Sequence, residues 1–104
     1  MEQIIKSLEQ IVSNCFQPHY KCHIKTVPQE DIPNNFCIHV IVPTDKTKNK
    51  TTTIRVIIPN ESLTHPNIEE KVESFTKNQI DETIKLHGDL GSIPKGYRAW
   101  KFAL

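Results

Sequence analysis

Three stretches of the chain alternate apolar and polar residues, which is the period of a β-strand with one buried face. They cover residues 20–27, 36–42 and 52–58, and their even-numbered positions form the predicted buried face. A sheet with one apolar face must bury that face against another layer, so the flanking segments determine the fold class. The predicted inward-facing residues are Tyr20, Cys22, Ile24, Thr26, Phe36, Ile38, Val40, Val42, Thr52, Ile54, Val56 and Ile58.

One helix is predicted before these strands in the sequence, and a second helix is predicted after them. In residues 1–14, the apolar residues recur at steps of three and four, which places them on one helical stripe. The second helix begins with Pro66 in its first turn, where a missing amide hydrogen costs nothing, and ends at Gly88 as a left-handed cap. Residues 44–50 are polar and rich in lysine, so the second and third strands are predicted to form a hairpin.

The apolar residues of the second helix do not share one stripe. Ile80 and Ile84 lie more than about 100° around the helix from the centre of the stripe formed by Ile68, Val72 and Phe75. One straight helix cannot bury both groups against the same surface. We therefore predict a break or bend near residues 76–78, or contact of the second stripe with another surface such as a second subunit.

The C-terminal part contains all three glycines, which predicts a glycine-containing hinge over residues 88–96. The tail, residues 97–104, alternates again and is interpreted as an edge strand, with a short helix as the alternative. The predicted fold class is therefore α+β. It consists of one domain, residues 1–104, with a small antiparallel sheet of three or four strands and helices packed on one face.

Composition restricts the environment of the protein. No window approaches the roughly 18 apolar residues needed to span a bilayer, and no signal peptide is recognised, so no membrane partner is predicted. The cysteines, Cys15, Cys22 and Cys37, are three in number and cannot all pair within one chain. A reducing, cytoplasmic location is the simpler interpretation.

The net charge of +1 conceals a separation of charge along the chain. Residues 15–58 contain six basic and three acidic residues, whereas residues 61–89 contain three basic and seven acidic ones. The outward side of the sheet and the adjoining hairpin are thus predicted to be basic. This surface either binds phosphates or an acidic partner, or it is a solvated surface without a binding role. The candidate binding residues here are Lys21, His23, Lys25, His39, Lys46, Lys48, Lys50 and Arg55.

The order helix, three strands, helix also occurs in double-stranded RNA binding domains, which makes nucleic acid an alternative partner. Such domains approach phosphates with a basic start to the last helix. Here that start carries Glu69, Glu70 and Glu73, which is the wrong sign of charge. The similarity concerns the order of elements alone.

The cysteine and histidine residues are the candidates for metal binding and thiol catalysis. Cys15 and Cys22 fall on predicted core positions, which leaves His23, Cys37 and His39 as metal-ligand candidates if the first two strands are neighbours. No paired-ligand C-x2-C spacing occurs, and the chain has no glycine before position 88 and hence no phosphate-binding loop. A Cys37 nucleophile on an open strand face would lack a cleft that excludes water. We predict no cofactor and no catalytic residue, and an enzyme is the less favoured class.

The tail gathers three aromatic residues, Tyr97, Trp100 and Phe102. They either close the core or form an anchor for a partner, since aromatic residues dominate both settings. Taken together, these features favour a small non-catalytic interaction domain that binds another protein or a second copy of itself. A nucleic-acid-binding domain that uses the basic sheet face and hairpin is the alternative.

Overall fold

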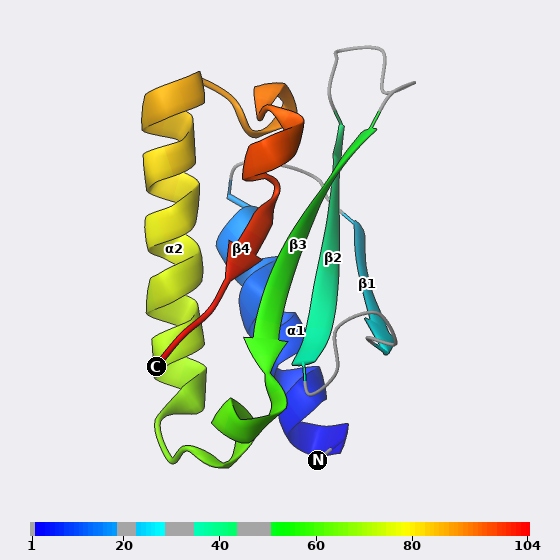
Figure 1. Ribbon diagram of the computed structural model, residues 1–104, viewed down its shortest axis with the longest axis vertical. Helices are drawn as coiled ribbons and strands as arrows, with labels where there is room; N and C mark the ends of the chain where they lie inside the picture. Colours follow the sequence, from blue (N-terminus) through cyan, green and yellow to red (C-terminus); the bar gives the residue numbers. More distant parts are fainter. Residues whose placement is uncertain (1, 19–22, 29–34, 44–50) are drawn as a thin grey trace.

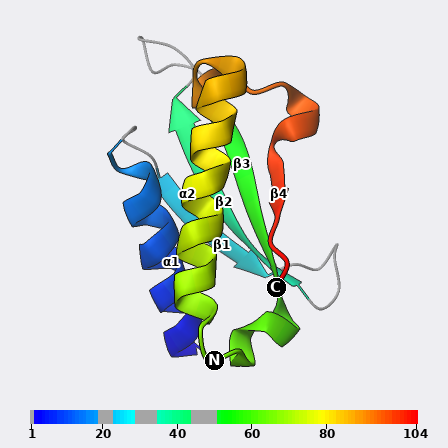
Figure 2. The same cartoon turned by 90° about the vertical axis from the view of Figure 1, so that its left-hand side faces the viewer.

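A computed structural model describes residues 2–18, 23–28, 35–43 and 51–104, and the side chains of these residues except Glu2 and residues 23–28. The chain forms α1 (Glu2–Phe16), β1 (His23–Pro28), β2 (Asn35–Pro43), β3 (Thr51–Pro59), α2 (Ile68–His87) and β4 (Ala99–Lys101) (Figure 1). Short 3-10 turns η1 (Asn60–Thr64), η2 (Leu90–Ser92) and η3 (Lys95–Tyr97) complete it. Both helices lie on one face of the sheet (Figure 2), which confirms the predicted α+β class.

The described strands form one sheet in the order β1-β2-β3-β4. β1, β2 and β3 are antiparallel neighbours, as predicted for the hairpin, whereas β4 pairs in parallel with β3. The sheet is therefore mixed rather than wholly antiparallel. The reason is the connection: α2 carries the chain back along the sheet, so β4 enters in the direction of β3, as in a β-α-β crossover.

The main core lies between the sheet and the helices. Every even-numbered position of β2 and β3 is buried, as the alternation predicts. α1 contributes the stripe of Leu8, Val12, Cys15 and Phe16, which are all buried. The buried sheet residues on this face are Phe36, Ile38, Val40, Val42, Thr52, Ile54, Val56 and Ile58.

Of the alternatives predicted for the second helix, the break is wrong, because α2 is continuous over 20 residues. Thr76 is fully buried and lies between the two apolar stripes, so Val72, Thr76 and Ile80 form one strip that winds around the helix. The Thr76 hydroxyl donates a hydrogen bond of 2.8 Å to the Val72 carbonyl, which makes the residue acceptable in an apolar setting. No helix among the described residues has the length and apolar character required to cross a membrane.

The tail closes the core from the β4 side. Trp100 and Phe102 are each 4% exposed, so the first of the two predicted roles, closing the core, applies to both. The Trp100 ring stacks on Phe16 with centroids 5.7 Å apart, and Phe102 meets Phe75 edge to face at 5.4 Å.

The segment predicted as a glycine-containing hinge is anchored to the same core. Leu90 and Ile93 are buried within and beside the turn η2. Asp89 caps this turn by accepting a hydrogen bond from the Gly91 amide at 3.0 Å. Gly88 ends α2 in the left-handed conformation with φ of 78°, as predicted.

Candidate interaction face on the open side of the sheet

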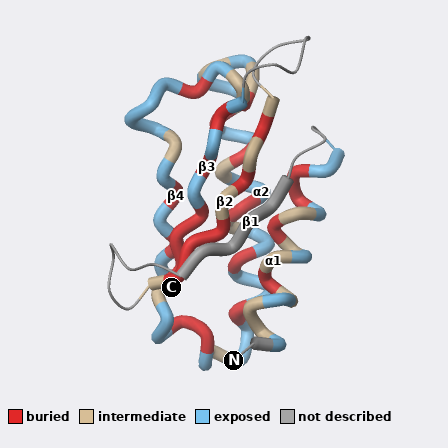
Figure 3. The backbone as a smooth tube through the Cα atoms, turned by 90° about the vertical axis from the view of Figure 1, so that its right-hand side faces the viewer, coloured by how far each residue is buried: buried red, intermediate tan, exposed pale blue. Residues whose placement is uncertain are grey.

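The sheet has a second face, opposite the helices, that no described helix covers (Figure 3). We call it the outer face. It carries the odd-numbered positions of the strands, because successive side chains alternate between the two sides. Its described residues are Cys37, His39, Ile41, Thr53, Arg55, Ile57, Ala99 and Lys101.

Strand register arranges these positions in rows across the sheet. Lys25, His39 and Arg55 are partners across β1, β2 and β3, so the sheet brings three of the predicted basic positions into one row. Arg55 is exposed and His39 is half-buried. These basic positions lie far apart in the sequence, and only the strand order places them side by side.

The row formed by Cys37 and Ile57 is buried, whereas the alternation predicts that it is exposed. Cys37 and Ile57, predicted to be displayed on the outward face, are 0% and 4% exposed. They are register partners on the two central strands, and they lie outside the main core. Burial raises the pKa of the Cys37 thiol to about 11, against a smaller lowering by the Arg55 charge. Arg55 therefore lies close to a small apolar patch rather than on a wholly polar surface.

The charges of the two layers have opposite sign. None of the four strands contains an aspartate or a glutamate, whereas α2 contains five acidic and three basic residues. Arg55 and Lys101 are exposed and form no ion pair with any residue that the structure describes. On the helical layer, by contrast, Lys77 pairs with Glu73 at 3.7 Å. Within the part of the chain that the structure describes, the outer face is thus the basic side.

The other predicted binding residues are either outside the described part of the chain or away from the row of Lys25, His39 and Arg55. Lys21, Lys46, Lys48 and Lys50 lie outside the described residues, and for His23 and Lys25 only the backbone is described. Tyr97 lies just before β4 and is 64% exposed. Its ring centroid lies 5.6 Å from that of His87. Trp100 and Phe102, as core residues, offer no surface for a partner.

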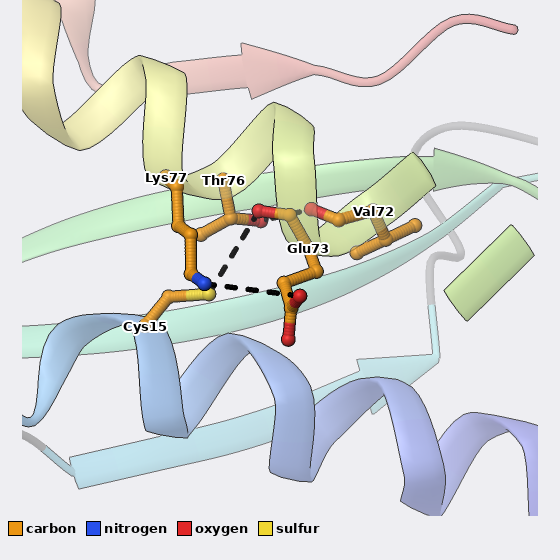
Figure 4. A network of polar contacts seen from close by, with 5 residues as sticks. All are labelled: Cys15, Val72, Glu73, Thr76 and Lys77. Carbon is orange, nitrogen blue, oxygen red and sulfur yellow. Dashed lines mark hydrogen bonds and ion pairs between the residues drawn. The ribbon is translucent and has the colours of Figure 1, made fainter. Parts of the chain in front are cut away.

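Of the metal-ligand candidates, Cys37 and His39 have described side chains, whereas for His23 only the backbone is described. Among the described residues, no three histidine, cysteine or acidic side chains cluster as a metal site would require. Cys15 is buried between α1 and α2, as predicted, and its thiol lies 3.9 Å from the Glu73 carbonyl (Figure 4). Burial raises the pKa of this thiol as well. Both described cysteines are therefore protonated at neutral pH.

We compared the chain with protein-family models, curated proteins and solved structures. None of them matches it. The functional argument therefore depends on the geometry and charge of the molecule itself.

Proposed function

We propose that this protein is a non-catalytic interaction domain whose outer face binds an acidic surface of a partner protein. The observation that carries the proposal is the absence of any carboxylate from the four strands, together with the exposed Arg55 and Lys101, which form no ion pair with a described residue. Complementary charge across an interface speeds association and selects partners. The acidic α2 lies on the opposite layer and does not neutralise this face.

A protein partner is favoured over nucleic acid by the side chains that the outer face displays. Single-stranded bases stack on exposed aromatic rings, but the described aromatic residues of the strands, Phe36 and Trp100, face the helices. The outer face instead combines the exposed Arg55 with the half-buried Ile41. Arginine beside apolar area is typical of protein interfaces.

A binding role is also favoured over thiol catalysis. The nucleophile in such chemistry is the thiolate, and Cys37 is fully buried with a pKa raised to about 11. Its thiol is therefore both inaccessible and protonated at neutral pH. The same argument applies to Cys15.

The test uses a fluorescein-labelled oligoglutamate peptide as a probe of acidic protein surfaces and a labelled RNA duplex as the competing class. We expect the peptide to bind at low salt and to be released as salt rises. Arg55→Ala should weaken binding about two- to fivefold, the range for one exposed charge. Lys85→Ala removes the same charge from the exposed surface of α2 and serves as the matched control.

Three results would overturn the proposal. One is that the peptide fails to bind at low salt, and another is that Arg55→Ala and Lys85→Ala weaken binding equally. The third is that RNA binds more tightly than the peptide and loses affinity in Arg55→Ala, which would identify a nucleic-acid-binding domain instead. Thermal unfolding of each variant checks that both retain the fold.

A further inference from the structure

β4 leaves one edge of the sheet open. The Arg55 amide donates to the Arg98 carbonyl at 2.8 Å, and the Phe102 amide donates to the Ile57 carbonyl at 2.9 Å. In a parallel pair, successive residues of a strand direct their backbone N–H and C=O groups alternately toward and away from the neighbouring strand. The N–H and C=O groups of Ala99 and Lys101 therefore point away from β3. Both residues are exposed. They present two donors and two acceptors at the edge.

Exposed apolar side chains lie at both ends of this edge. The large exposed hydrophobic residues of the described chain are Leu86, Tyr97 and Leu104, and the last two lie just before and just after β4. Beside Leu104, a groove of about 400 Å³ separates the tail from the start of α2. Phe75 and Phe102 line this groove, with Lys71 and Ser74 on the helix side.

We infer that β4 is a self-association edge, where a second copy of this chain pairs its own β4 in the antiparallel direction. Ala99 of each copy would lie opposite Lys101 of the other, with Trp100 on the two-fold axis. The outward N–H and C=O groups of both residues would then form four reciprocal hydrogen bonds. The two sheets would join into one continuous sheet.

A second copy would supply an edge with the same two donors and two acceptors, so it can pair with this edge reciprocally. This register places the small Ala99 opposite Lys101, whereas a shift of one residue toward the C-terminus would place Lys101 opposite its own copy and bring like charges together. The antiparallel direction also brings Tyr97 of each copy alongside the residues that follow β4 in the other, next to the groove. Both exposed apolar residues at this edge would thereby be covered.

The expected association is weak, because β4 has only three residues and a lysine on an edge normally discourages pairing. The affinity therefore depends on the edge hydrogen bonds together with Tyr97 and the groove. A substitution that removes one of these contributions should therefore weaken dimerisation by a measurable amount.

The decisive variant is Lys101→Pro, compared with Lys101→Ala. Because the Lys101 amide points away from β3, proline at this position removes no hydrogen bond within the chain and is compatible with an edge strand. It does remove the two equivalent edge donors of the dimer. Lys101→Ala removes the same side chain and charge but keeps the amide, so it is the matched control.

Sedimentation velocity of the full chain over a range of concentrations measures the dimerisation constant. We expect a reversible monomer–dimer equilibrium for the wild type and for Lys101→Ala, and dimerisation at least about tenfold weaker for Lys101→Pro. Tyr97→Ser should also weaken it. Trp100 fluorescence and the urea midpoint show whether each variant is folded, and Tyr97→Ser tests the same edge without altering the strand backbone.

A wild type that stays monomeric at the highest concentration would overturn the inference. So would a dimer that forms equally well in folded Lys101→Pro and in Tyr97→Ser, because its interface would then lie elsewhere. Neither result bears on the outer face, since the oligoglutamate test depends on Arg55 and not on the edge amides.

Discussion

Cys37 should make the stability of this protein fall at alkaline pH. Its side chain is fully buried, and burial raises the pKa of the thiol from 9.0 to about 11. Below pH 9 the thiol is protonated in both the folded and the unfolded chain, so its contribution to stability is complete. Between about pH 9 and 11 only the unfolded chain loses the proton, and the free energy of unfolding therefore falls as pH rises.

The expected loss follows from the size of this shift. Each pH unit between the two pKa values costs about 1.4 kcal/mol, so the whole interval of about two units corresponds to roughly 2 to 3 kcal/mol. That is a large fraction of the roughly 5 to 10 kcal/mol expected for a domain of this size. The effect should therefore be visible in an ordinary unfolding experiment.

The assay is urea denaturation under reducing conditions at pH 8 and near pH 10.5, followed by Trp100 fluorescence, for the wild type and Cys37→Ala. The variant loses packing by an amount that does not depend on pH, and all other titrating groups are common to both proteins. We expect the stability advantage of the wild type to shrink by about 2 kcal/mol between the two pH values. If both proteins lose stability in parallel, the thiol ionises as readily in the folded state as in the unfolded state, and the reasoning is refuted.

Three further substitutions test the packing. Trp100→Ala should cost about 3 to 5 kcal/mol in urea denaturation followed by circular dichroism, because it removes the stack on Phe16; a loss below about 1 kcal/mol would contradict a core role. Thr76→Val should change stability by less than about 1 kcal/mol, since the Val72 carbonyl keeps its helical amide donor, and a larger loss would mean that the hydroxyl itself holds α2 together. Gly88→Ala should cost about 1 kcal/mol in thermal unfolding from its φ of 78° alone, because no atom lies within 4 Å of the added methyl group; an unchanged midpoint would rule out that strain.

Part of the architecture is encoded locally and was predictable. Alternation with a period of two identified β2 and β3 and their buried residues, because a strand next to an apolar layer must place every second side chain inside. The stripe of α1 and the left-handed Gly88 cap follow from equally local rules. The acidic α2 and the absence of acidic residues from the strand segments are also properties of the sequence.

Other features depend on which segments become neighbours, and local periodicity does not contain that information. The displaced stripe of Ile80 and Ile84 suggested a break, but α2 is continuous, and the hydrogen bond to Val72 allows the helix to bury Thr76. Cys37 and Ile57 have the parity of surface residues, yet both are buried in the folded chain. The parallel direction of β4 leaves Ala99 and Lys101 on an open edge.

The amino-acid order alone thus determined which side of each strand is apolar and where the charges lie along the chain, since both depend on residues a few positions apart. Tertiary structure decided that Lys25, His39 and Arg55 share a row, that Trp100 closes the core, and which backbone groups remain at the edge. These relations join residues tens of positions apart. They arise only when the chain is packed, because the choice of neighbouring strand is made by the burial of the whole sheet against both helices.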